Sequence, residues 1–111
     1  MNEDLENVKG VYDRLDQIQL VDCREQYEWD AGRVEGAIFI PLNTLMAGGG
    51  PALDASTPVA VICRSGNRSA YAAQALAARG LNTVNVSDGM TGWAVAGRPM
   101  VSEDGTEPHV A

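Results

Sequence analysis

The strongest structural constraint in this sequence is a short apolar run that ends at a cysteine and leads into a helix. Residues 58–62 are rich in β-branched side chains and open with a proline, which predicts a strand buried on both faces of a parallel sheet. Residues 69–79 carry small apolar side chains at helical spacing, and Gly80 follows at the position of a left-handed cap. Cys63 and the residues after it therefore form a strand-to-helix turn.

This turn predicts a site for an anionic sulfur. Backbone N–H groups at a helix start lack partners within the helix, and with the helix dipole they attract negative charge, to which Arg64 and Arg68 add two cations. A thiol with an unperturbed pKa of about 8.5 is roughly 3% thiolate at pH 7, whereas a pKa lower by ~2 units makes it mostly thiolate. The alternative is a buried structural cysteine, but a glycine-containing loop with two arginines favours a nucleophile. We therefore interpret Cys63 as a nucleophile.

Three segments that follow one another along the chain carry a family pattern. Residues 63–70 read CRSGNRSA, residues 20–42 read LVDCREQYEWDAGRVEGAIFIPL, and residues 88–100 read DGMTGWAVAGRPM. Together they resemble the active-site loop, the Asp-x-Arg-Glu block and the closing Trp…Gly-x-Pro block of the rhodanese family of sulfurtransferases. The resemblance spans residues 18–100, and the combination is more specific than any one segment.

The resemblance implies an α/β fold of the rhodanese-like type, a three-layer α/β/α arrangement around a central parallel five-stranded sheet. The 111 residues are enough for a single domain, and we expect it to span residues 1–111, with a core at about 3–100 and a flexible tail at 101–111. The residue patterns themselves predict strands at 18–22, 38–40, 58–62 and 83–86 and helices at 3–15, 25–32 and 69–79, with a flexible loop at 47–56.

The resemblance also implies a reaction, in which Cys63 takes a sulfane sulfur from an anionic donor such as thiosulfate and holds it as a persulfide. A nucleophilic acceptor, which is cyanide, a thiol or a sulfur-carrier protein, then removes the sulfur. In this scheme the arginines bind the anionic part of the donor, and the rest of the loop supplies small side chains and backbone donors around the sulfur. The substrate-binding residues are then Arg64, Ser65, Gly66, Asn67, Arg68 and Ser69. The scheme needs neither a general base nor a cofactor.

Two other functions remain as alternatives. Cysteine phosphatases and arsenate reductases use the same fold with five residues between Cys and Arg, whereas four residues separate Cys63 from Arg68, which favours a pocket for one sulfur atom. The domain is alternatively a persulfide-relay or interaction module for a protein partner. Retention of Cys63 and of both arginines argues against a module that serves only for interaction or regulation, but a domain that passes persulfide sulfur to a protein partner would have the same residues.

The sequence departs from the family pattern at three positions. Arg33 and Glu35 stand where the family usually has His and Pro, which affects a local hydrogen bond and not the loop. Cys23 stands where an aliphatic residue is usual, and its simplest interpretation is a small buried hydrophobe. A disulfide between Cys23 and Cys63 is the alternative, because the family fold brings these two strand ends together.

Other polar residues at strand ends are interpreted as structural. Asp22 and Arg24 are expected to hold their turn together, and Asp88 is expected at the same sheet edge as Cys63. Trp93 is expected to pack under the loop. The single histidine, His109, lies in a polar segment without a neighbouring cysteine, so the sequence predicts no metal site.

The charge distribution separates the chain into an acidic and a basic part. Residues 1–30 hold nine acids and three bases, a balance of −6, whereas residues 58–98 hold four arginines and one aspartate, a balance of +3. A net charge of −7 argues against nucleic acid as a partner, while the basic part attracts a small anion. No signal peptide or membrane span is predicted, and we expect a cytoplasmic protein without a membrane partner.

Overall fold

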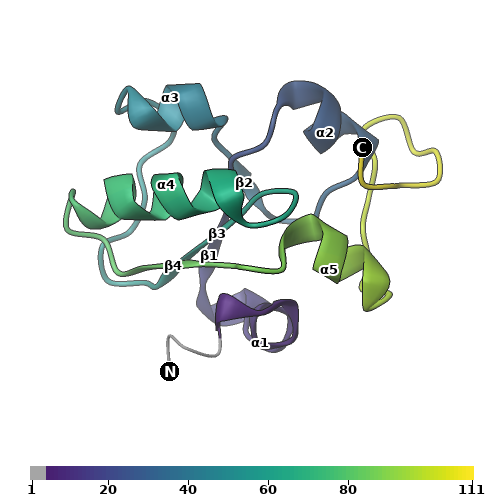
Figure 1. Ribbon diagram of the computed structural model, residues 1–111, viewed down its shortest axis with the longest axis horizontal. Coiled ribbons are helices and arrows are strands. Elements are labelled where there is room, and N and C mark those ends of the chain that lie inside the picture. The colour runs from purple at the N-terminus through teal and green to yellow at the C-terminus, as the bar shows by residue number, and fades with distance from the viewer. Residues whose placement is uncertain (1–4) are drawn as a thin grey trace.

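A computed structural model describes residues 5–111, whose centre is a parallel sheet. Within this range the sheet has four strands, in the spatial order β2-β1-β3-β4 (Figure 1). The strands are β1 Gln19–Asp22, β2 Ile38–Phe39, β3 Val59–Ile62 and β4 Thr83–Asn85. Each lies within one or two residues of a strand expected from the sequence, so the predicted parallel sheet is confirmed.

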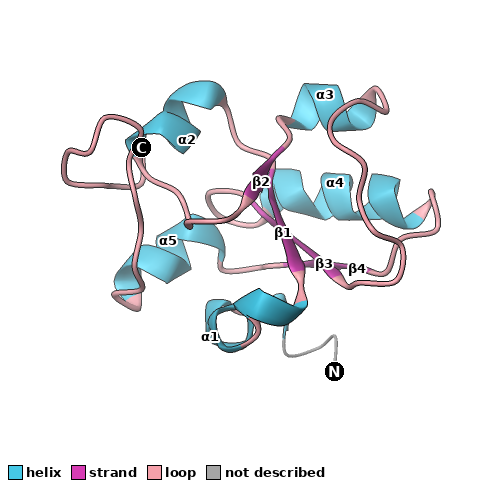
Figure 2. Cartoon of the chain, turned by 180° about the vertical axis from the view of Figure 1, so that it is seen from behind, coloured by secondary structure: helices cyan, strands magenta, loops and turns pink. Residues whose placement is uncertain are grey.

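Helices cover both faces of the sheet and make three layers (Figures 1 and 2). Helices α3 (Leu42–Met46) and α4 (Asn67–Ala77) lie on one face, and α1 (Val8–Asp13) and α5 (Gly89–Val95) lie on the other. Side chains that alternate along β1 and β3 point to opposite faces. They therefore divide the core into two clusters, with Leu20 and Ile62 in the cluster of α1 and α5, and Val21 and Val61 in the cluster of α4.

The expectation of a five-stranded sheet is wrong, because the described residues form a sheet of four strands. The family resemblance supplied that number, whereas the residue patterns marked four β-rich runs. The nearest further pairing is an isolated antiparallel bridge in which Arg33 and Val101 exchange two backbone hydrogen bonds of 2.9 Å. This bridge cannot extend, since Pro99 has no N–H group and the N–H of Glu103 donates to the carbonyl of Asp30.

The helices differ from the expected ones where tertiary contacts decide the boundaries. The expected helix at 3–15 is shorter, because Asn7 caps α1 by accepting the N–H of Gly10 at 2.9 Å; residues 3 and 4 lie outside the described range. The helix expected at 25–32 is α2 (Gln26–Ala31), and a 3-10 turn, Leu15–Gln17, precedes β1. Helices α3 and α5 were not expected, since α3 is only five residues long and α5 contains two glycines.

The C-terminal residues, for which a flexible tail was expected at 101–111, lie beside α2. The N–H of His109 donates to the carbonyl of Ala31 at 3.1 Å, and Val110 packs on the core cluster of α1 and α5. Figure 1 shows this segment, in yellow, beside α2. The polar composition of residues 101–111 hides these contacts, because they are mainly made by the backbone.

Candidate active site

Cys63 follows β3, a central strand of the sheet, and its sulfur faces a loop that wraps around it. The Cys63 residue is only 1% exposed. The N–H of Gly66 donates to the sulfur at 3.1 Å and the N–H of Ser69 at 3.4 Å, while the Ser69 hydroxyl lies 3.2 Å from it. The predicted cradle of backbone donors is therefore present, and it closes around the sulfur at the start of α4.

Gly66 makes the tight turn of this loop. Its φ of 95° is in the left-handed region, and a Cβ atom there would meet the backbone oxygen of Ser87 at 2.4 Å. The carbonyl of Gly66 also accepts the side-chain amide of Asn85 at 3.0 Å. Asn85, at the end of β4, and Ser87, which follows it, thus both lie against the loop at Gly66.

The pKa of Cys63 is lowered from 9.0 to about 4 by its neighbours. The largest contribution is a hydrogen bond from the Cys23 thiol; burial opposes the change, and the Ser69 hydroxyl and the N–H groups of Ser69 and Gly66 add to it. The sulfur is therefore a thiolate at neutral pH, stabilised by fixed donors. Cys23 keeps its proton, because the same hydrogen bond and its burial raise its pKa.

We predict that the Cys63 thiolate persists far below neutral pH. A folded-state pKa depressed to about 4 means that the thiolate is complete at higher pH and is lost only as the pH falls through that value. The ultraviolet thiolate absorbance of the protein minus that of a Cys63→Ser variant should therefore be flat from about pH 6 to pH 9. A difference that rises with a midpoint near ~8.5, as for an ordinary thiol, would contradict this.

Ser69 links the nucleophile to Asn85 at the end of β4. Its hydroxyl donates to the side-chain oxygen of Asn85 at 2.5 Å and lies next to the Cys63 sulfur. A hydroxyl has one proton, so Ser69 donates to only one of these two groups at a time. Asn85 was missed by the sequence analysis, because nothing in its own segment indicates that it supports a loop nineteen residues earlier.

Arg68 is held by Glu28, a residue that the sequence analysis did not single out. Two hydrogen bonds, of 2.7 and 2.9 Å, join the guanidinium to the carboxylate, whose side chain is 2% exposed against 32% for Arg68. Burial raises the pKa of Glu28, but the bonds from Arg68 and from the backbone outweigh it and leave that pKa lowered. The pair joins α2 to the active-site loop. The capping box that Glu25 and Glu28 form at the start of α2 signals a helix start but not this pairing.

Arg64 lies on the outer side of the loop and is solvent-exposed. Its carbonyl accepts the N–H of Thr91 at 3.0 Å, and its side chain has no ion pair within residues 5–111. Ser65 and Asn67 are exposed beside it. Of the two predicted arginines, Arg64 is thus the one whose charge is not already committed to a carboxylate.

The carboxylates of the other strand-end residues make structural contacts. Arg24 and Asp22 form a fully buried ion pair of 2.8 Å, and Arg24 also donates to the carbonyl of Gly32 at 2.7 Å. The Asp88 carboxylate accepts the N–H of Val8 at 3.1 and 3.3 Å and so caps α1. Neither carboxylate is free to act as a general acid on a ligand of Cys63.

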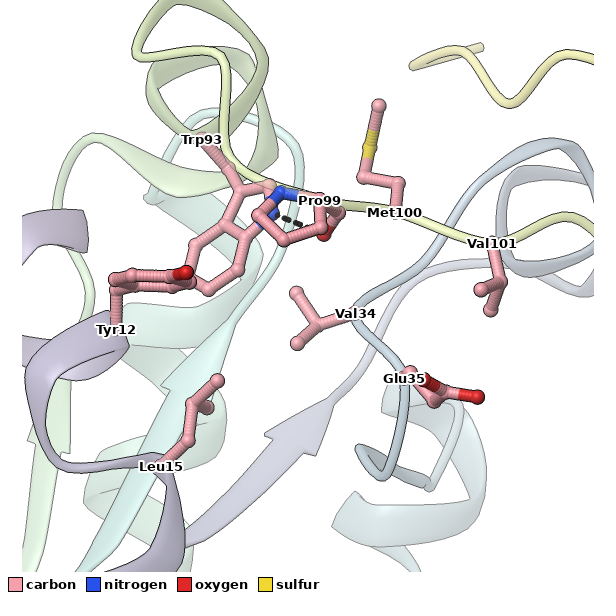
Figure 3. Close-up of a pocket in the computed structure, with 8 residues that line it drawn as sticks. All are labelled: Tyr12, Leu15, Val34, Glu35, Trp93, Pro99, Met100 and Val101. Carbon is pink, nitrogen blue, oxygen red and sulfur yellow. Dashed lines mark hydrogen bonds between the residues drawn. The ribbon is translucent and has the colours of Figure 1, made fainter.

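Trp93 packs away from the loop that it was expected to support. It belongs to the core cluster of α1 and α5, where its indole N–H donates to the carbonyl of Pro99 at 2.9 Å. The N–H of Met90 instead contacts the active-site segment, donating to the carbonyl of Cys63 at 2.8 Å. A cavity of about 170 Å³ beside this tryptophan is separate from the cysteine loop (Figure 3); it is lined by Tyr12, Leu15, Val34, Glu35, Trp93, Pro99, Met100 and Val101.

Within residues 5–111 no group of three or more His, Cys, Asp and Glu side chains is arranged to hold a metal ion. Over the same residues, no helix combines the length and the apolar character that crossing a membrane requires.

Comparison with known proteins finds a family match that includes this loop and the strands of the sheet. The rhodanese-like domain family matches residues 7–96. A rhodanese-related protein from Thermoplasma volcanium superimposes with a TM-score of 0.76 at 34% identity, covering 86% of this chain and 94% of that one.

Two curated relatives carry names that concern sulfur transfer. A putative sulfurtransferase of Bacillus subtilis is 32% identical over 84 residues, which are 76% of this chain and 81% of that protein. A probable adenylyltransferase/sulfurtransferase of Mycobacterium tuberculosis is 33% identical over 84 residues, 74% of this chain. The chain spans only 21% of the length of the Mycobacterium protein. These likenesses support sulfur transfer in general.

Proposed function

The chain belongs to the family of rhodanese-like domains, and from this premise we propose that it transfers sulfane sulfur from thiosulfate to a nucleophilic acceptor through a persulfide on Cys63. The observation that carries the proposal is the Cys63 sulfur itself. It accepts backbone N–H groups from Gly66 and Ser69 and has a pKa of about 4, so it is a nucleophile without a general base.

The first step forms a bond between the Cys63 sulfur and the outer sulfur of thiosulfate. The bond between the two donor sulfurs breaks, and its electron pair leaves with sulfite. The new persulfide is an anion one atom longer than the thiolate. The N–H groups of Gly66 and Ser69, which donate to the Cys63 sulfur, support the negative charge of this group.

The second step returns the cysteine to its thiolate. An acceptor such as cyanide or a thiol attacks the outer sulfur of the persulfide, and the Cys63 thiolate leaves. Arg64, Ser65 and Asn67 are the exposed residues of the loop, and we expect a small anion or a partner thiol to approach the sulfur past them. An acceptor on a protein is supported by the name of the Mycobacterium relative, which joins a sulfurtransferase to an adenylyltransferase.

Intact-mass spectrometry tests this proposal directly. Reduced protein incubated with thiosulfate should gain one sulfur atom on Cys63 and release one sulfite. Addition of cyanide should remove the sulfur and produce thiocyanate. No gain of sulfur by a protein whose Cys63 thiolate is present would overturn the proposal.

We predict that the protein hydrolyses aryl phosphates at no more than the background rate. Four residues separate Cys63 from Arg68, and the Arg68 guanidinium is bound to Glu28, so it is not free to clamp three phosphate oxygens. A chromogenic aryl phosphate assay alongside the thiosulfate assay measures both activities on one sample. Efficient phosphate hydrolysis would favour the phosphatase alternative instead.

A further inference from the structure

Cys23 lies beside the nucleophile on the neighbouring strand. β1 and β3 run in parallel with Asp22 opposite Ile62, and the pairing continues because the N–H of Cys23 donates to the carbonyl of Ile62 at 3.1 Å. Residues next in register on such strands are separated by about 4.8 Å between strands. A disulfide requires Cα atoms about 4.4 to 6.8 Å apart. The backbone therefore allows a bond between Cys23 and Cys63.

The two side chains also share one face of the sheet. Val21 and Cys23 on one strand, and Val61 and Cys63 on the other, belong to the core cluster of α4, while Ile62 belongs to the opposite cluster. Both cysteines are free thiols, and both are buried. The strand register and the shared cluster therefore place the two thiols next to each other, and the pKa of each is shifted by the other.

We propose that Cys23 is a resolving thiol, which attacks the Cys63 sulfur after it has taken up a sulfane sulfur and releases that sulfur as hydrosulfide. This activity rests on the proposed function, because it begins from the Cys63 persulfide. The loop donors on Gly66 and Ser69 belong to the turn before α4, whereas Cys23 directly follows β1, so they approach Cys63 from different elements. Attack by Cys23 on the inner sulfur therefore comes from the strand side and not from the loop.

The step balances without an external oxidant. A bond forms between the sulfurs of Cys23 and Cys63, and the bond between the Cys63 sulfur and the sulfane sulfur breaks. The electron pair of the broken bond and the proton of Cys23 leave with the sulfane sulfur as HS⁻. The two cysteines are oxidised to a disulfide, and the sulfane sulfur is reduced to sulfide. A dithiol reductant then returns the pair to two thiols.

The chemistry of Cys23 sets the speed of this step. Its pKa is raised by the hydrogen bond to Cys63 and by burial, so it carries the proton that the departing sulfur needs. A protonated thiol is a poor nucleophile, so resolution is slower than attack by an external thiolate or cyanide. The persulfide therefore serves an acceptor when one is present and is cleared as sulfide when none is.

A single-turnover experiment without an acceptor tests the proposal. Reduced wild-type protein and a Cys23→Ser variant are loaded anaerobically with one equivalent of thiosulfate at mildly alkaline pH, and intact mass and free sulfide are followed. Both proteins should first gain one sulfur. The wild type should then lose that sulfur together with two hydrogens and release one sulfide per protein, whereas Cys23→Ser should keep its sulfur. Cys23→Ala provides a second variant without a thiol.

The other possible outcomes would contradict the proposal, and they distinguish failure of the resolving role from failure of the proposed function. A wild-type persulfide as long-lived as that of Cys23→Ser would overturn the resolving role and leave the proposed function intact. Sulfur mapped to the Cys23 peptide would show attack on the outer sulfur instead. A disulfide in a thiosulfate-free control would show that the sulfane sulfur is not the oxidant. Failure of every protein to gain sulfur would overturn the proposed function as well.

Discussion

Replacing Cys63 by serine is expected to reduce thiosulfate-dependent sulfur transfer to the background rate while leaving the fold in place. A serine hydroxyl is not ionised at neutral pH and cannot carry a persulfide, so both steps of the reaction are lost. The change replaces one atom at a position that is 1% exposed, and the packing of β3 against α4 is kept. Thiocyanate formation measures the activity, and circular dichroism with thermal unfolding measures the fold.

The same substitution at Cys23 is the matched control for that experiment. Cys23 and Cys63 are both buried in one cluster, so a general cost of placing a hydroxyl there should affect both variants alike. Cys23→Ser should still gain sulfur from thiosulfate, and Cys63→Ser should not. Substantial turnover by natively folded Cys63→Ser would mean that another group is the nucleophile.

The loop at Cys63 was predictable because the information for it is contiguous in the sequence. A buried strand, a glycine with φ of 95° and a helix start follow one another within a few residues, and the backbone donors come with that local geometry. Two of the donors to the thiolate, the N–H groups of Gly66 and Ser69, lie within six residues of it. Local patterns of this kind are what sequence analysis detects well.

The partners of the loop were not predictable, because each is brought there by the fold. Glu28 precedes Arg68 by forty residues, and its segment indicates only a helix start. Asp88 follows Val8 by eighty residues; the segment it begins lies at the sheet edge of Cys63, as expected, but its carboxylate caps α1, which was not expected. In both cases the fold brings the carboxylate to its partner, and local sequence preferences carry no information about such a long-range contact.

The position of Cys23 was only partly predictable, because it depends on strand register. The sequence predicts that Cys23 and Cys63 directly follow two apolar strands, and the structure confirms both positions. A shift of one residue between β1 and β3 would turn one thiol to the opposite face. Only the observed pairing of Asp22 with Ile62 places both sulfurs in one cluster, and this pairing carries the proposal of a resolving thiol.

The two arginines of the loop are expected to have different effects when replaced by alanine. Arg64 is exposed and has no ion-pair partner in the described part of the chain, so Arg64→Ala should weaken thiosulfate binding and leave the free energy of unfolding unchanged. Losing a charge-assisted contact costs about 1.5 to 3 kcal/mol, which is roughly a 10- to 150-fold decrease in kcat/KM. The dependence of kcat/KM on ionic strength should flatten, because charges are screened over ~10 Å at 0.1 M salt.

Arg68→Ala should instead destabilise the protein, because it leaves the Glu28 carboxylate, 2% exposed, without its partner. We expect a loss of about 1 to 3 kcal/mol in the free energy of unfolding and a disturbed loop. Glu28→Gln is the matched control: it removes the charge that Arg68 pairs with, but the guanidinium, 32% exposed, can still reach water, so the loss should be smaller. Denaturant unfolding and salt-dependent kinetics of the three variants test the assignment. Unchanged thiosulfate kinetics in both alanine variants would show that the N–H groups of Gly66 and Ser69 hold the donor alone.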